Sequence, residues 1–144
     1  MIRQQITDQL KDAMRAHDGV KLETLRYVLS QIKYVEIDKK HELSDDEVIS
    51  VCANEVKKRR EAIELFKKSG RDELVREEDA KLAIILALMP KQLTRDEIIT
   101  LVDDAIAKIG KENMGALMKV LQPQVKGKAD GKLVSEIVKE RMTT

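Results

Sequence analysis

The spacing of the apolar residues constrains the fold most, because they recur every three or four positions along almost the whole chain. Such a spacing places apolar side chains on one face of an α-helix. One stripe of this kind consists of Leu22, Leu25, Leu29 and Ile32. No segment shows the convincing alternation of apolar and polar residues that is typical of a half-buried strand. We therefore predict an all-α protein.

Capping residues divide this pattern into separate helices. Ser44 with Glu47, and Thr94 with Glu97, form two predicted capping boxes, in which a hydroxyl and a carboxylate satisfy the first amides of a helix. The other expected boundaries are N-terminal caps at Asp72, Asn113 and Asp130 and helix ends at Gly19, Pro90, Gly110 and Pro123. This arrangement predicts seven helices, of which the one opened at Ser44 is long.

Residues 90–93 are the expected boundary between two domains, because Pro90 stops one helix and the next begins only at Thr94. We predict an N-terminal helical domain over residues 1–90, with about four helices, and a small three-helix bundle over residues 91–144. A chain of 144 residues is long enough for one domain of ordinary size or two small ones.

Composition excludes several kinds of function. Lys and Arg number 27 against 26 Asp and Glu, so the net charge of +1 creates no global field for nucleic acid, and electrostatic recognition has to be local. The only aromatic residues are Tyr27, Tyr34 and Phe66, too few for a surface that stacks unpaired bases. The single cysteine, and the lack of an apolar run long enough to span a membrane, lead us to expect a soluble cytoplasmic protein that does not bind membranes.

No group of residues carries an obvious catalytic or metal-binding pattern. Cys52 lies on an apolar helix stripe, where a buried core thiol is expected, and His17 and His41 have no second ligand at metal spacing. Phosphate-binding glycine loops and nucleophile elbows are absent from the sequence. The basic run of residues 57–60 is interleaved with glutamates and is expected to form a solvated helix face. We expect no catalytic residue, no metal ion and no cofactor.

The C-terminal segment is the one locally charged region. Residues 108–141 contain eight basic and four acidic side chains, a net charge of +4. Glycines near the lysines would let a phosphate backbone approach closely, and a helix N-terminus favours anions. A solvated turn that the glycines merely shape explains the same residues, so both interpretations stay open. The candidate nucleic-acid-binding residues are Lys119, Lys126, Gly127, Lys128, Gly131 and Lys132.

The same segment carries a family resemblance. Residues 114–119 (MGALMK) followed by residues 125–131 (VKGKADG) resemble the signature of the GatB/YqeY family. Agreement continues upstream in the same order, at Leu25-Arg26, Arg60, Ala62-Ile63, Phe66, Gly70-Arg71, Leu74 and residues 89–93 (MPKQL). Leu88 stands where relatives often have an aromatic residue before a Leu-Pro pair. The resemblance covers almost the whole chain.

The resemblance implies an all-helical protein similar to the C-terminal tail of the GatB subunit of the aspartyl/glutamyl-tRNA amidotransferase. It implies a non-catalytic module whose partner is tRNA or a tRNA-handling complex, including the amidotransferase itself or other translation components. Two alternatives remain: an accessory role in glutamine-dependent amide transfer, a carbon–nitrogen ligase reaction, and a protein-interaction scaffold that uses the long helix of residues 44–68. The catalytic parts of the amidotransferase lie outside its tail, so we expect no turnover by this chain alone.

Overall fold

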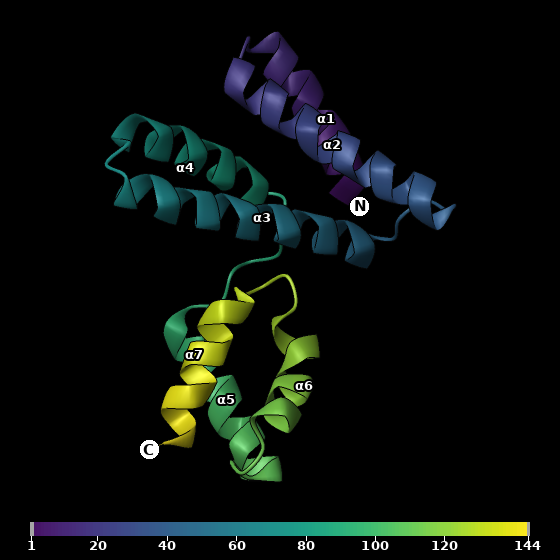
Figure 1. Ribbon diagram of the computed structural model, residues 1–144. Helices are drawn as coiled ribbons and strands as arrows, with labels where there is room; N and C mark the ends of the chain where they lie inside the picture. The colour runs from purple at the N-terminus through teal and green to yellow at the C-terminus, as the bar shows by residue number, and fades with distance from the viewer. Residues whose placement is uncertain (1, 144) are drawn as a thin grey trace. The chain divides into compact units, whose positions relative to one another are not determined.

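The computed structural model describes residues 2–143, which form seven α-helices and no strand (Figure 1). The helices are α1 (Ile2–Arg15), α2 (Gly19–Lys39), α3 (Asp45–Lys68), α4 (Asp72–Leu86), α5 (Arg95–Ile109), α6 (Met114–Val125) and α7 (Gly131–Met142). The predicted all-α fold, with four N-terminal and three C-terminal helices, is confirmed. Across the described residues, no helix has both the length and the apolar character that crossing a membrane requires.

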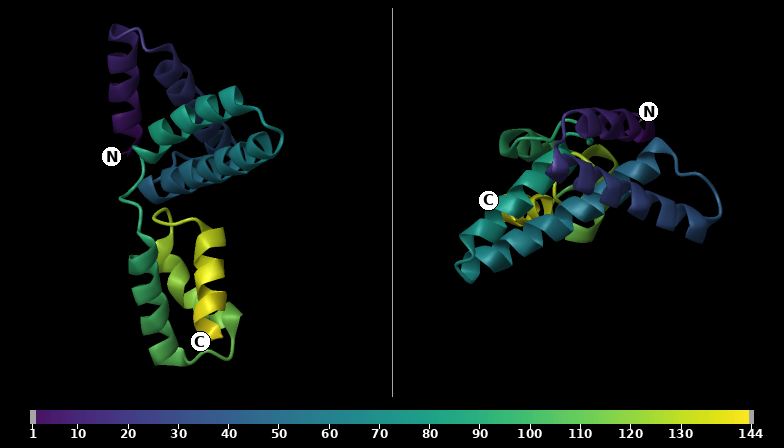
Figure 2. Two further views of the ribbon diagram at one scale, coloured as in Figure 1. Left: turned by 90° about the vertical axis from the view of Figure 1, so that its left-hand side faces the viewer. Right: turned by 90° about the horizontal axis from the view of Figure 1, so that it is seen from above.

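The first compact unit extends to Pro90 and contains α1–α4. In it α1 packs against α2, and α3 lies alongside α4 (Figure 2). The apolar faces of these helices meet in one core, whose buried members are Ile6, Leu25, Val28, Ile32, Leu43, Val48, Cys52, Val56, Ile85 and Leu88. Of the stripe predicted in residues 22–32, Leu25 and Ile32 are fully buried in this core and Leu29 packs against it.

The second compact unit begins at Lys91 and contains α5–α7. Its separate core consists of Ile98, Val102, Ala105, Leu117, Leu121, Val125, Val134, Ile137 and Val138. Two ion pairs also join α5 to the last turns of α7. Arg141 donates from Nε and Nη2 to the two carboxylate oxygens of Asp103, at 2.9 and 3.0 Å, and Arg95 pairs with Glu140. The two-point contact of Arg141 adds directional specificity to the packing of α7 against α5.

Local capping accounts for most of the helix starts. The capping boxes at Ser44 and Thr94 are both present, with the hydroxyl accepting from the third helical amide and the glutamate accepting from the cap amide. Asn113 and Asp130 cap α6 and α7 as predicted, and Gly110 ends α5 with a φ of 80°. These boundaries could be predicted because each depends on residues only a few positions apart.

Two helix starts differ from the prediction. Gly19 is the first residue of α2 rather than the end of α1, because Asp18 caps α2 by accepting from the Lys21 amide at 3.1 Å. The left-handed turn after α1 belongs to His17, whose φ is 56°. Asp72 is the first residue of α4 and makes no cap, so its carboxylate stabilises the helix through the favourable field at the N-terminus.

Pro123 does not end α6, which was the expectation. Proline has no amide to donate to the carbonyl four residues earlier, and its ring crowds that carbonyl, yet α6 continues past Pro123 for two residues to Val125. The Lys126 amide then donates to the Gln122 carbonyl at 3.0 Å and closes the last turn. A proline this close to the end of a helix removes one hydrogen bond without removing the turn that follows.

The Glu36 carboxylate ties α2 to two other segments of the first unit. It accepts from both terminal nitrogens of the Arg3 guanidinium on α1, one of them at 2.6 Å, and from the backbone amide of Leu43 at 2.9 Å. The hydrogen bonds from Arg3, and after them that from Leu43, lower the pKa of Glu36 from its ordinary value of 4.5 to about 2.

This lowered pKa makes the stability of the first unit depend on pH. A carboxylate whose pKa is lower in the folded state contributes stability above its unfolded pKa, and the contribution is lost as the pH falls from about 4.5 towards about 2. Glu36→Gln should therefore lower the melting temperature by several degrees at neutral pH, and the gap to wild type should shrink below about pH 4.5. Circular-dichroism melts at several pH values measure this, with Glu61→Gln on the exposed side of α3 as the control. An undiminished gap at acidic pH would contradict the assignment.

Candidate nucleic-acid interface

The four candidate lysines lie on α6, on α7 and on the connection between them (Figure 1). Lys126 follows the last residue of α6, Lys128 lies in the connection, and Lys132 is in the first turn of α7. Lys119 lies seven residues before Lys126, about 10 Å along the helix and on the same side of it. All four side chains are exposed. We call Lys126, Lys128 and the backbone between them the basic turn.

Gly127 holds the basic turn in shape. Its φ is 73°, in the left-handed region that favours glycine, and the residue is buried. The Gly127 carbonyl accepts from Nε2 of Gln92 at 2.9 Å, and the Lys128 carbonyl accepts from the Leu93 amide at 2.8 Å. Within the turn, the Lys128 amide donates to the Val125 carbonyl at 2.8 Å. The backbone is thus fixed, while the two lysine side chains point to solvent.

Gly131 has a different role from Gly127. It is exposed, it opens α7, and it is not among the residues with positive φ. A Cβ added there would meet nothing within 4 Å. Asp130 caps the helix by accepting from the Lys132 amide at 3.3 Å. The conformation therefore requires glycine at position 127 and leaves position 131 open to other residues.

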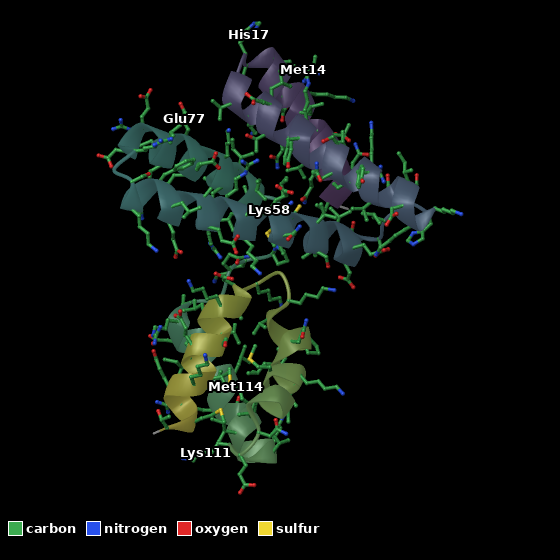
Figure 3. The ribbon with its side chains drawn as sticks, viewed as in Figure 1. Met14, His17, Lys58, Glu77, Lys111 and Met114 are labelled. Carbon is green, nitrogen blue, oxygen red and sulfur yellow. The ribbon has the colours of Figure 1, made fainter. Side chains whose placement is uncertain are left out.

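The remaining basic residues of this segment lie away from the basic turn. Lys108 and Lys139 belong to the last turns of α5 and α7, and Lys111 lies on the connection that leads into α6 (Figure 3). Arg141 is held by Asp103, whose hydrogen bonds raise the pKa of the guanidinium. The basic turn thus lies at one end of the second unit. The opposite end carries Lys108, Lys111, Lys139 and Arg141.

The basic run of residues 57–60 is partly used in contacts within the first unit. Nη1 of Arg59 donates to the Glu78 carboxylate of α4 at 3.2 Å, and its guanidinium lies 5.3 Å from the centre of the Tyr27 ring. Nζ of Lys58 lies 3.5 Å from the buried Glu55 carboxylate. These pairs connect α2, α3 and α4, so Arg59 serves packing rather than presenting charge to solvent.

Cys52 is fully buried in the first core, as predicted. Burial, and after it the nearby Glu55 charge, raise the pKa of the thiol to about 11, so the reactive thiolate is disfavoured. His17 projects from the α1–α2 connection, and Nδ1 of His41 lies 2.8 Å from the Glu42 carbonyl (Figure 3 labels His17). Over residues 2–143, no three side chains of the metal-binding types gather at one place.

Two features of the structure were missed by reasoning from the sequence. The Gln92 side chain donates a hydrogen bond to the basic turn, although the acceptor lies 35 residues away in the chain. The exposed side of α2 carries Val20, Tyr27 and Tyr34 seven residues apart, and Tyr34 is 74% exposed. The seven-residue spacing could have revealed this stripe, because it places residues on one side of a helix. No sequence signal connects Gln92 with Gly127.

Comparison with known proteins matches nearly the whole chain. The family model described as "Yqey-like protein" matches residues 3–142. A protein of Eremothecium gossypii named "Altered inheritance of mitochondria protein 41, mitochondrial" is 38% identical over 85 residues, 58% of this chain and 46% of that relative. A protein of the same name from Pyrenophora tritici-repentis is 29% identical over 136 residues, 91% and 75% of the two chains. An uncharacterized protein of Schizosaccharomyces pombe is 30% identical over 86 residues, 60% and 70%.

These names contradict one expectation from the sequence. Three relatives, including one from Kluyveromyces lactis, are named as mitochondrial proteins, so the predicted cytoplasmic location is wrong. The prediction used a lone cysteine and the absence of a membrane-spanning run. Both features fit any reducing compartment and cannot single out the cytoplasm. The chain spans less than half the length of the Eremothecium gossypii relative.

Proposed function

The chain belongs to the YqeY-like protein family. On that premise we propose that it is a non-catalytic helical module that binds tRNA through its C-terminal unit. The observation that carries the proposal is the basic turn, in which a backbone fixed by Gln92 and Leu93 presents Lys126 and Lys128 to solvent. A fixed backbone loses little conformational entropy when it binds, so weak phosphate contacts can add up.

Lysine contacts to phosphates position an RNA without reading its sequence. Lys119 and Lys132 extend the basic turn along α6 and α7, and the four exposed lysines suit a phosphate backbone that follows the two helices. With about four contacts, the logarithm of the binding constant should fall with the logarithm of salt concentration at a slope of about −3.

The proposal assigns no chemistry to the chain. Cys52, its only cysteine, is buried with a raised pKa and does not serve as a nucleophile. A role in glutamine-dependent amide transfer would then consist of holding the tRNA for a partner enzyme that performs the reaction. Purified chain supplied with glutamine, ATP and mischarged tRNA is expected to give no product.

Reversing the charge of the basic turn tests the binding site. Lys126→Glu combined with Lys128→Glu should weaken tRNA binding by about 10- to 100-fold at low salt and reduce the salt slope to about half, because two of about four phosphate contacts are lost. Fluorescence anisotropy over a salt series measures both quantities. The matched control is Lys108→Glu with Lys139→Glu, which changes the net charge equally at the opposite end of the unit.

The outcomes separate the site from the function. Equal losses in both double variants would mean that net charge alone drives binding, and the basic turn would not be the site. Wild-type protein without affinity for tRNA at low salt would overturn the proposed function. Circular dichroism of each variant checks that the helices persist.

A further inference from the structure

A small cavity opens beside the basic turn, between α6 and α7. Its volume is about 230 Å³, and its lining combines two kinds of surface. Val125 and Val134 are buried and Met118 is half-buried, so they form its apolar interior. Gln122 and Lys126 are exposed and form its polar rim. Lys126 therefore belongs both to the cavity and to the basic turn.

The chemistry of this lining suits a flat heteroaromatic ring. Apolar walls and a polarizable thioether at Met118 pack against the faces of a ring. The Gln122 amide both donates and accepts hydrogen bonds, so it can pair with the polar edge of a base. A purely aliphatic group would leave that amide and the Lys126 ammonium without a ligand partner at the rim. A charged group would enter an interior that offers it no opposite charge.

The composition of the second unit limits the ways in which it could hold a base. Proteins commonly hold unpaired bases by stacking them on aromatic side chains. All three aromatic residues of this chain precede residue 67, so the second unit contains none. A base that binds this unit has to be held by aliphatic walls, and the cavity beside the basic turn provides them.

We propose that the cavity between α6 and α7 receives one unpaired nucleobase of the bound RNA, while Lys126 and Lys128 contact the phosphates that flank it. The inference rests on the proposed function and adds a preference for RNA with accessible bases over continuous duplex. A base inserted in this way adds binding energy that a duplex cannot supply, because the bases of a duplex are stacked and paired.

Gly131→Leu blocks the cavity without changing the charge. Gly131 lines the cavity, and a Cβ there meets no atom within 4 Å, so the new side chain has room at the mouth. The matched control is Gly19→Leu, since Gly19 also opens a helix behind an aspartate cap and also has open space around it. A second variant, Gln122→Leu, removes the amide from the polar rim of the cavity. Leucine is a good helix former, and position 122 is exposed on α6.

The experiment compares tRNA with a blunt RNA duplex of similar length, by fluorescence anisotropy at one salt concentration. Wild-type protein should bind tRNA about tenfold more tightly than the duplex, because the apolar surface that one base buries in the cavity contributes only to the binding of tRNA. Gly131→Leu should abolish this ratio while the affinity for duplex is retained, Gln122→Leu should reduce it, and Gly19→Leu should preserve it.

Each failure has a separate meaning. Wild-type protein that binds neither RNA would overturn the proposed function and the inference with it. Wild-type protein that binds both RNAs equally, or a Gly131→Leu variant that keeps the full preference for tRNA, would overturn the base pocket alone. Lys128→Glu, which changes the basic turn outside the cavity lining, should weaken binding of both RNAs and leave their ratio nearly unchanged.

Discussion

Leu121→Ala is expected to leave the second unit mostly unfolded at physiological temperature while the first unit stays folded. Leu121 is fully buried in the core that α5, α6 and α7 share. Truncating a buried leucine to alanine costs about 2–5 kcal/mol, since packing contacts are lost and a cavity remains. A single small core of this kind seldom supplies more than about 3–5 kcal/mol of net stability. The substitution therefore removes most of what holds the unit together.

Two-dimensional amide NMR spectra of the full chain measure this effect. In Leu121→Ala, signals from residues after Pro90 should collapse to unfolded positions, whereas those of α1–α4 should remain dispersed. Leu25→Ala, in the core of the first unit, is the reciprocal control. Loss of both sets of signals in either variant would show that the two cores fold as one cooperative unit.

Gly127→Ala should destabilise the second unit by about 1–2 kcal/mol, whereas Gly131→Ala should be neutral or stabilise it by up to about 1 kcal/mol. Gly127 has a φ of 73°, where a Cβ crowds the neighbouring carbonyl oxygen, and its burial prevents the turn from relaxing outward. Gly131 opens a helix without a positive φ, so alanine there restricts only the unfolded chain. Chemical denaturation of both variants gives the two changes.

The alanine variants of the two glycines should also differ in their affinity for tRNA. Gly127→Ala should weaken tRNA binding even under conditions where the unit stays folded, because the carbonyl that Gln92 holds would move and the basic turn would lose its fixed shape. Gly131→Ala should bind like wild type. Equal stabilities for the two variants would contradict the left-handed turn.

The sequence predicted those features that depend on near neighbours. The capping boxes at Ser44 and Thr94, and the caps at Asn113 and Asp130, each involve groups within three positions, so their residue types are enough to locate them. The helix ends predicted at Gly19 and Pro123 were wrong, because the residues around a glycine or a proline can decide where a helix ends. Asp18 caps one position earlier than Gly19, and α6 continues for two residues past Pro123.

The candidate site shows where sequence reasoning stops. Gly127 and Gly131 look alike in the sequence, and only the backbone angles and the Gln92 contact distinguish the buried turn residue from the open helix start. The cavity was not predicted either. It forms where side chains of α6 meet those of α7, and such packing depends on the relative placement of two helices rather than on any local pattern.

The contacts of Gln92 and Leu93 with the basic turn also determine where the C-terminal unit can be cut. Two hydrogen bonds run from these residues to the carbonyls of Gly127 and Lys128, so the stretch that looks like a linker is a structural part of the second unit. A fragment that starts at the Thr94 cap would keep all three helices and lose both bonds, and a fragment that starts at Lys91 would keep them. Through the same two hydrogen bonds, a displacement of residues 91–93 would also move the backbone that carries Lys126 and Lys128.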